Sequence, residues 1–545
     1  MLREDRRGFP DTDFPADGID TIARAARWAR DHYRDREAII EGTRRLTFDQ
    51  YIGMASAVAK GLIAAGLEIG DRVAIWAPNS VDFALATVGT YMAGAVLVPV
   101  NTRFKAPEVD FIVRQARIKF AFAAEEFLTM RYADVLAGLW PDESERPRIV
   151  RLGAAGGDSL SQFLADGALL DDEALNARVA LIGADDIASI LFTSGTTGRP
   201  KGAMLRHGAI VRGYWTFSGA VGVREGDRYL CSNPFFHAFG LMAGLLASLM
   251  RGAAIYPMAV FSAERALEII ERERITFFPG PPTVFQELLK SYQSGRRDIS
   301  SLRASVIGAT TLPAPLIRAM YDRLGFEEIH SPYGFTEGTA LATVTIAPDS
   351  REIVATTAGL PLPGIDVRVV RPDGSLAAPG EVGEIVVGGW NRMAGYLDPV
   401  TGGVSDGSER ADMHSGDLGE LDEDGYLRVR GRIKDMFIAG GFNVYPAEVE
   451  ACLEEMPQVE SAAVVAMPDR RLGEVGCAFI VSAPGQQVTE AEISAWCRER
   501  IANFKVPRAV VFVSELPMNA TGKVAKAELS KRVPMQQGSS GENDY

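Results

Sequence analysis

The chain has 545 residues, enough for roughly three or four folding units at about 150 residues each. Hydrophobic residues make up 47 % and charged residues 23 %, which is typical of globular proteins and excludes a disordered, collagen-like or small disulfide-rich chain. The formal net charge of −14 provides no basic surface for a nucleic acid or an anionic membrane, so an anionic ligand would need local donors.

Cysteine usage and hydropathy both indicate a soluble protein of the cytoplasm. The four cysteines (Cys231, Cys452, Cys477 and Cys497) are scattered without metal-ligand spacing, and the first twenty residues contain no apolar stretch typical of an export signal. Residues 83–100 are uncharged over eighteen positions, but Gly89, Gly94 and Pro99 interrupt them. We therefore expect a buried helix and a buried strand there, and no integral membrane segment.

The first half of the chain alternates helical and strand patterns. This βα alternation predicts parallel sheets covered by helices. Residues 140–172 are rich in Ala, Gly, Pro and charge and are expected to form a loose surface excursion. The expected helices span residues 47–66, 81–92 and 106–116, and the expected strands span residues 72–76, 96–100 and 119–123.

The second half changes to short strands separated by turn signals. Residues 365–370, 382–387 and 422–429 predict a β-rich subdomain, and helical and strand patterns alternate again after Arg432. The expected fold is therefore α/β: a large N-terminal domain of parallel-sheet subdomains plus the β-rich subdomain (residues 1–433), and a small α+β C-terminal domain (residues 434–533). The polar tail, residues 534–545, is expected to be disordered.

The strongest chemical signal is the segment ILFTSGTTGRPKG at residues 190–202. Glycines let backbone N–H groups approach an anion closely, hydroxyl side chains add further donors, and Lys201 supplies a positive charge for phosphate. The spacing differs from that of a Walker A loop. Composition alone leaves a flexible surface turn open as the alternative.

The segment TSGTTGRPKG is similar to the phosphate loop of the adenylate-forming superfamily, which includes acyl-CoA synthetases, luciferases and peptide-synthetase adenylation domains. Fatty-acyl-CoA synthetases resemble the chain most. Five further matches follow in the family's order over more than 300 residues: YGFTE (333–337), HSGD (414–417), GRIKD (431–435), GGFNVYPAE (440–448) and NATGK (519–523).

The resemblance implies a site for ATP and Mg²⁺. Tyr333 would stack on adenine, Asp417 would accept both ribose hydroxyls with help from Arg432, Thr336 would contact the α-phosphate, and Glu337 with Thr193 would bind the metal. The full set of residues expected to bind ATP or AMP is Thr193, Ser194, Gly195, Thr196, Thr197, Gly198, Lys201, Gly308, Ala309, Thr310, Tyr333, Gly334, Asp417 and Arg432.

Lys523 is the expected catalytic lysine of the first step, together with Thr336 and His237. A lysine between an attacking carboxylate and the α-phosphate offsets charge that grows in the transition state. His237 would border the carboxylate pocket, although a histidine among aromatic residues is also a common core residue. The region lacks the aspartate that amino-acid-activating relatives use, which argues against an amino acid substrate.

The resemblance further implies two orientations of a mobile small domain about a hinge at Lys434, with Gly440, Gly441 and Asn443 facing CoA. The carboxylate would react with MgATP to give acyl-AMP and pyrophosphate, and the CoA thiol would then displace AMP. The partners are thus a small carboxylic acid and CoA, with a homodimer left open.

The acid itself is expected to be apolar, because the predicted acyl pocket around Tyr214, Gly280 and Gly338 is small-sided and without a cation. Medium- or long-chain fatty acids and alicyclic or steroid-derived acids fit, with benzoate- or cinnamate-type acids as the alternative. An acyl-AMP ligase that loads a carrier protein is a second alternative, although no insertion separates Arg432 from Ala447. A luciferase-like oxygenase is a third.

Overall fold

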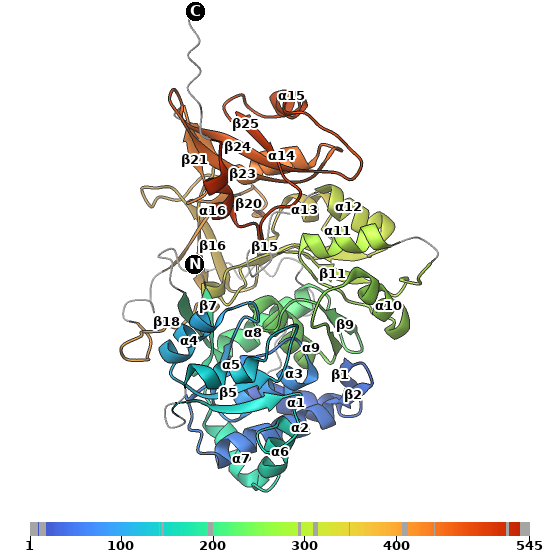
Figure 1. The fold of residues 1–545 in the computed structure, drawn as a ribbon, viewed down its shortest axis with the longest axis vertical. Helices are drawn as coiled ribbons and strands as arrows, with labels where there is room; N and C mark the ends of the chain where they lie inside the picture. Colours follow the sequence, from blue (N-terminus) through green and yellow to red (C-terminus); the bar gives the residue numbers. More distant parts are fainter. Residues whose placement is uncertain are drawn as a thin grey trace, which may run out of the picture.

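The computed structural model describes residues 9, 18–140, 142, 146–193, 200–292, 296–308, 314–347, 349–405, 412–440, 442–518 and 523–534 (Figure 1). The predicted tail lies almost wholly outside them. The largest sheet has the strand order β18-β8-β7-β4-β3-β5-β6, in which all pairs are parallel except β7 with β8 and β8 with β18. Its strands are β3 (Arg72–Trp76), β4 (Val96–Pro99), β5 (Ile118–Ala124), β6 (Arg148–Leu152), β7 (Ile187–Thr193), β8 (Lys201–Arg206) and β18 (Gly395–Tyr396).

Helices cover this sheet, and they alternate with its strands along the chain as the sequence predicts. The Ser80 side chain accepts the N–H of Phe83 and caps α3, and Gly94, at φ +78°, ends the helix before β4. All of β4 is buried, as is α3 apart from Asp82, so residues 83–100 are a core helix and strand as predicted. The helices of this part are α1 (Ile22–Tyr33), α2 (Phe48–Ala64), α3 (Val81–Met92), α4 (Ala106–Gln115), α5 (Tyr132–Leu139), α6 (Leu160–Gly167), α7 (Asp172–Leu181) and α8 (His207–Ala220).

The prediction of a loose excursion over residues 140–172 is wrong. β6 pairs in parallel with β5 at the edge of the large sheet, and α6 packs on α2 so closely that a Cβ on Gly167 would lie 2.0 Å from the carbonyl oxygen of Ala57. The sequence did not predict this strand because edge strands tolerate charged residues. Here Arg148 and Arg151 obscure the alternation of apolar and polar residues.

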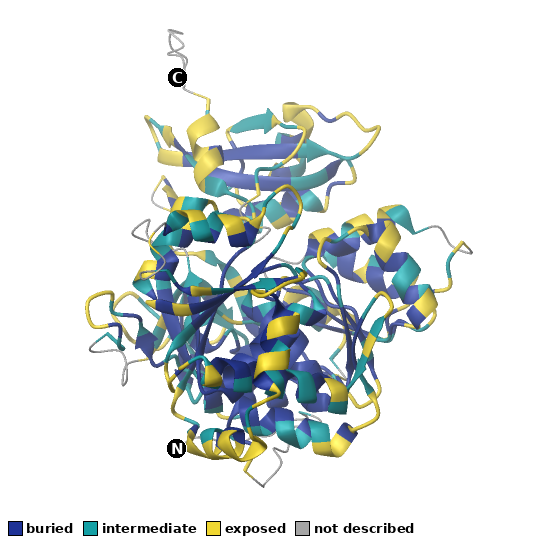
Figure 2. Ribbon diagram, turned by 60° about the horizontal axis from the view of Figure 1, so that its bottom comes forward, coloured by how far each residue is buried: buried dark blue, intermediate teal, exposed yellow. Residues whose placement is uncertain are grey.

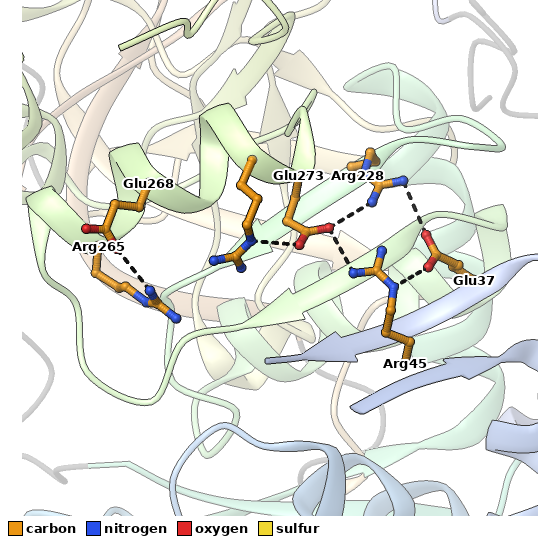
Figure 3. Close-up of polar contacts among 7 residues, drawn as sticks. Glu37, Arg45, Arg228, Arg265, Glu268 and Glu273 are labelled. Carbon is orange, nitrogen blue, oxygen red and sulfur yellow. Dashed lines mark hydrogen bonds and ion pairs between the residues drawn. The ribbon is translucent and has the colours of Figure 1, made fainter. Parts of the chain in front are cut away.

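A second sheet, β2-β1-β10-β9, extends through bridges at Phe277 to β11 and β12. A network of ion pairs closes one end of it (Figure 3): Glu273 accepts from Arg45 and Arg228, and both arginines also pair with Glu37. Because Glu273 is only 8 % exposed, these pairs neutralise a buried charge and fix α10 to the sheet. The elements are β1 (Glu37–Glu41), β2 (Arg44–Thr47), β9 (Arg228–Cys231), β10 (Ala254–Pro257), β11 (Ala304–Val306), β12 (Glu328–His330), the π-helix η1 (Phe239–Leu246), α9 (Ala247–Arg251), α10 (Ala263–Glu273), α11 (Pro282–Ser291) and α12 (Ala314–Arg323).

The β-rich part follows where the sequence predicts it. A three-stranded sheet and a four-stranded antiparallel sheet hold short strands joined by turns, with the 3₁₀ turn η2 and a single short helix between them. They comprise β13 (Pro332–Tyr333), η2 (Thr336–Gly338), β14 (Thr343–Val344), α13 (Arg351–Thr356), β15 (Leu360–Pro361), β16 (Ile365–Val370), β17 (Gly383–Gly389), β19 (Met413–Leu421) and β20 (Leu427–Arg432).

The strands after Arg432 form a separate five-stranded sheet, at the top of Figure 1. Alternate residues of β23 point to its two faces, so Val464 packs with α14 and α15 while Val465 packs with α16. Figure 2 shows long stretches of these strands in the colour of buried residues. The elements are β21 (Phe437–Ala439), β22 (Phe442–Val444), α14 (Pro446–Glu454), β23 (Val459–Asp469), β24 (Gly473–Ser482), α15 (Glu490–Arg500), β25 (Ala509–Phe512), α16 (Lys526–Leu529) and η3 (Ser530–Arg532).

All four cysteines are buried, as expected of core residues. Cys452 on α14 and Cys497 on α15 are nevertheless not isolated, because they belong to one core cluster and each thiol shifts the pKa of the other. No helix within the described ranges is long and apolar enough to cross a membrane.

Candidate active site

The turn after β13 presents two of the predicted site residues, Thr336 and Glu337. Directly after them, Thr339 (φ +53°) and Ala340 (φ +57°) adopt the left-handed backbone conformation that residues with a Cβ rarely take. Gly334, predicted to bind ATP, has a packing role here: a Cβ at this position would lie 2.4 Å from the backbone of Ala340. The turn is therefore strained and fits closely against its own start.

Two residues far away in sequence fix this strained turn. The Asn391 side-chain amide donates to the carbonyl oxygens of Leu341 (2.6 Å) and Gly338 (3.2 Å), and the backbone carbonyl of Asn391 accepts the Thr339 hydroxyl at 2.6 Å. The Tyr214 hydroxyl donates to the Thr339 carbonyl at 3.0 Å. Tyr214 and Gly338, predicted in the acyl pocket, are thus buried parts of the support under Glu337.

The Glu337 carboxylate is surrounded by hydroxyl groups. Oε1 accepts the Tyr396 hydroxyl at 2.8 Å and lies 3.5 Å from the Thr193 hydroxyl. Among the described residues no lysine, arginine or histidine forms an ion pair with Glu337. A carboxylate with oxygen neighbours and no cation partner fits a hard cation such as Mg²⁺, which takes one or two carboxylates plus substrate phosphates.

The phosphate loop connects β7 to β8 as an antiparallel hairpin. Thr193 and Lys201 are cross-strand partners at its two ends, and the Lys201 ammonium lies 5.3 Å from the centre of the Tyr396 ring. Both predicted end residues therefore lie beside Glu337. The predicted residues between them, Ser194, Gly195, Thr196, Thr197 and Gly198, lie outside the described residues.

The predicted nucleoside residues form one hydrogen-bonded group. Asp417, only 6 % exposed, accepts a hydrogen bond from the Tyr333 hydroxyl at 2.8 Å and forms an ion pair with the Arg432 guanidinium, whose Nε lies 2.9 Å away. Burial and the neighbouring Asp417 charge raise the pKa of Tyr333 well above its usual range, so Tyr333 stays a donor. Gly308 packs on Pro332 next to this group, whereas Ala309 and Thr310 lie outside the described residues.

Lys523, from the C-terminal part of the chain, lies beside this group. Lys523 is exposed as a whole residue, but the protein atoms packed around its ammonium lower the pKa of Lys523. The charges of Arg432 and Lys434 lower it further, and Asp417 opposes them. Burial and the Lys523 charge also lower the pKa of His237 to about 4, so the imidazole is neutral at pH 7. The His237 Nδ1 accepts the N–H of Phe239 at 3.3 Å, which leaves the proton on Nε2.

The π-helix η1 begins two residues after His237. A Cβ on Gly240 would lie 2.2 Å from the carbonyl oxygen of Pro234, and a Cβ on Gly244 would lie 2.8 Å from the Cys231 sulfur. Glycine therefore lets this helix lie directly on the end of β9, which fixes His237 at the site. Gly280, the remaining predicted acyl residue, is buried where the chain bridges to Ile307.

The predicted hinge residue lies in the segment that joins the two parts of the chain, and the residues predicted to face CoA lie on the first hairpin of the C-terminal part. Lys434 is exposed in the turn between β20 and β21, and Gly440 (φ +59°) and Asn443 are exposed on the β21–β22 hairpin. Gly441 lies outside the described residues. An ion pair between Lys290 on α11 and Glu460 on β23 joins the two parts at a second place and raises the pKa of Lys290.

Sequence reasoning missed Asn391 and Tyr396. Both belong to the segment Trp390–Leu397, whose backbone bonds to the Glu337 turn and to β8: the N–H of Met393 donates to the Glu337 carbonyl and that of Ala394 to the Met204 carbonyl. The only local signal was Gly395, which has a φ of +151°. The role of both side chains depends on partners fifty or more residues away in sequence.

Comparison with known proteins agrees with this geometry. Residues 25–397 match the family model of AMP-binding enzymes, and residues 448–523 match that of the AMP-binding enzyme C-terminal domain. A (7a-methyl-1,5-dioxo-octahydro-1H-inden-4-yl)propanoyl:CoA ligase of Mycobacterium tuberculosis is 42 % identical over 91 % of this chain and 95 % of the relative. A feruloyl-CoA synthase of an Amycolatopsis species is 36 % identical over the same shares of the two chains.

Solved structures share the whole fold. The ATP-bound crystal structure of MatB from Rhodopseudomonas palustris gives a TM-score of 0.81 at 29 % identity and covers 94 % of this chain and 98 % of that chain. The mixed α/β fold and the resemblance to adenylate-forming enzymes are thereby confirmed. The chain belongs to the AMP-binding enzyme family and, within it, to the ATP-dependent acyl-CoA ligases.

Proposed function

We propose that the protein activates an apolar carboxylic acid in two steps, first to acyl-AMP with release of pyrophosphate and then to acyl-CoA with release of AMP. The observation that supports this best is the position of Lys523. A lysine from the C-terminal part lies close enough to His237 for its charge to lower the pKa of the imidazole, and close enough to Asp417 for that carboxylate to act on its own pKa.

In the first step, Asp417 and Arg432 would bind the ribose, and Lys201 with Thr193 would bind the outer phosphates. Lys523 would lie between the carboxylate of the acid and the α-phosphate, where its charge stabilises the negative charge that accumulates in the transition state. Neutral His237 would offer its Nε2 proton at the same place without adding a second positive charge. Mg²⁺ bound at Glu337 would neutralise charge on the phosphates.

In the second step, residues 434–533 would turn about Lys434 and bring Gly440 and Asn443 toward the acyl-AMP. The exposed β21–β22 hairpin supports this role, because glycine at its tip leaves backbone N–H and carbonyl groups open to a pantetheine chain. Lys523 would leave the site in the same motion. One residue would therefore serve the adenylation step alone.

We propose a bicyclic or other alicyclic propanoate-type acid as the substrate class, with medium- and long-chain fatty acids next. Similarity over nearly the whole chain to a ligase for an indenyl propanoate supports this choice. The described acyl segments, residues 214–217, 280–283 and 334–339, contain no lysine or arginine that would pair with a second carboxylate. The similarity to a feruloyl-CoA synthase supports aromatic acids as the second candidate.

A pyrophosphate-release assay with MgATP over a panel of acids, with and without CoA, tests this proposal. The panel holds a bicyclic propanoate, fatty acids from short to long, benzoate and ferulate. We expect CoA-dependent turnover with the highest kcat/KM for the bicyclic acid. Turnover confined to ferulate or benzoate would contradict the alicyclic substrate class and favour aromatic acids. Pyrophosphate release without any formation of acyl-CoA would contradict the CoA-ligase step.

A further inference from the structure

The segment Met393–Leu397 lies between the two charged groups expected to handle the phosphates. Its backbone donates to the Glu337 carbonyl through Met393 (2.8 Å) and to the Gly202 carbonyl through Leu397 (2.7 Å). β18, which contains Tyr396, also pairs with β8, so Tyr396 lies opposite Ala203. One short segment thus bonds to the Glu337 turn and to the strand that begins at Lys201.

The Tyr396 side chain contacts both charged groups at once. Its hydroxyl donates to Glu337 Oε1 at 2.8 Å, and the Lys201 ammonium lies 5.3 Å from the ring centre, within the range of a cation–π contact. The preceding Gly395 has a φ of +151°, a conformation that a residue with a Cβ would strain to adopt. The backbone conformation at Gly395 thereby places the Tyr396 side chain between Glu337 and Lys201.

Lys201 and Glu337 carry opposite charges and lie beside the same ring, yet they form no ion pair with each other. A direct pair would neutralise the carboxylate needed for a metal ion and the ammonium needed for phosphate. Instead, the ring of Tyr396 makes a cation–π contact with the Lys201 ammonium, and the Tyr396 hydroxyl donates a hydrogen bond to one carboxylate oxygen of Glu337. Neither interaction removes a charge, so both groups stay available to a ligand.

We propose that Tyr396 is a positioning residue that separates Lys201 from Glu337 and fixes the carboxylate for Mg²⁺ bound with ATP. This inference rests on the proposed function. Hydrogen-bond partners of metal ligands orient those ligands, and their loss costs about 10- to 100-fold in metal affinity. The hydroxyl and the ring of Tyr396 would contribute separately, because each contacts a different group.

Two variants separate the contributions. Tyr396→Phe removes the hydroxyl and keeps the ring under Lys201, whereas Tyr396→Leu removes both. Tyr426→Phe is the matched control, because the Tyr426 hydroxyl donates to the Asp349 carboxylate at 2.6 Å in a contact to which we assign no part in nucleotide binding. Binding of ATP is measured by isothermal titration calorimetry over a series of Mg²⁺ concentrations. Binding of AMP without metal is measured alongside.

For Tyr396→Phe we expect the Mg²⁺ concentration that gives half-maximal ATP affinity to rise roughly tenfold, with excess Mg²⁺ restoring the wild-type affinity. For Tyr396→Leu, ATP binding should stay weak even at saturating Mg²⁺, because Lys201 and Glu337 can then pair. AMP binding should stay within twofold of wild type in both variants, and Tyr426→Phe should change neither ligand.

A Mg²⁺ midpoint for Tyr396→Phe within twofold of wild type would overturn the positioning role, as would an equal loss of AMP and ATP affinity. In both cases the wild type still binds MgATP, so the proposed function would survive. A wild type that binds no MgATP would contradict the proposed function itself and this inference with it.

Discussion

Replacing Asn391 with alanine should release the strained turn that presents Thr336 and Glu337. Two consecutive residues there, Thr339 and Ala340, adopt the left-handed conformation at a cost of about 1–2 kcal/mol each. The Asn391 amide offsets this strain with two hydrogen bonds to buried carbonyl oxygens, each with a net value of about 1 kcal/mol. Asn391→Ala also leaves the Leu341 carbonyl without its donor, whereas the Gly338 carbonyl keeps the N–H of Leu341. We therefore expect a loss of roughly 2–4 kcal/mol in the free energy of unfolding.

Urea unfolding followed by tryptophan fluorescence measures this loss, and the rate of pyrophosphate release reports the turn itself. We expect that rate to fall at least tenfold, since Glu337 moves when the turn relaxes. The second variant is Ala340→Gly in the Asn391→Ala background, which removes part of the strain and should return about 1 kcal/mol. A free energy of unfolding for Asn391→Ala within 0.5 kcal/mol of wild type, or no recovery on adding Ala340→Gly, would refute the reasoning.

Three further predictions concern other parts of the molecule. Gly240→Ala should lower the free energy of unfolding in urea by about 3 kcal/mol, because the new Cβ would lie 2.2 Å from the Pro234 carbonyl oxygen. Gly53→Ala, in an open position of α2, should raise it by about 0.5–1 kcal/mol. Equal effects of the two substitutions would contradict the close packing at η1. Burial and a neighbouring carboxylate raise the pKa of Glu454 to about 7, so the folded protein keeps a proton that the unfolded chain loses near pH 4.5. The free energy of unfolding should therefore fall by about 3 kcal/mol between pH 5 and 8. Glu454→Gln should abolish that dependence on pH, and the same dependence in both proteins would exclude Glu454 as its source. Because the pKa of Lys523 is lowered, the adenylation rate should decline at a pH below 10.5 as the ammonium deprotonates. Lys523→Arg should move this decline to a higher pH. The same decline at the same pH in both proteins would assign the titration to another group.

Buried elements were predictable from the sequence where one local pattern determined them. The helix α3, the stop at Gly94 and the strand β4 follow from an uncharged stretch with glycine interruptions. The edge strand β6 did not follow, because an edge position tolerates charge that conceals its alternation. Elements with mixed exposure therefore depend on neighbours that no local window contains.

The site divides in the same way. Thr193, Lys201, Glu337 and Asp417 were predictable because their motifs resemble those of a known family, and the structure brings the first three together at one end of β7 and β8. Asn391 and the hydroxyl of Tyr396 were not predictable, since each acts on a backbone or side chain fifty or more residues away. A side chain that supports another has no signature in its own sequence neighbourhood.

The central claim is that ATP is cleaved at its α-phosphate through an acyl-adenylate. Phosphorus NMR of a reaction with ATP, Mg²⁺, a bicyclic propanoate and CoA measures this directly. The account predicts AMP and pyrophosphate in equal amounts with the acyl-CoA formed, and acyl-AMP that accumulates when CoA is omitted. Formation of ADP and inorganic phosphate would contradict it.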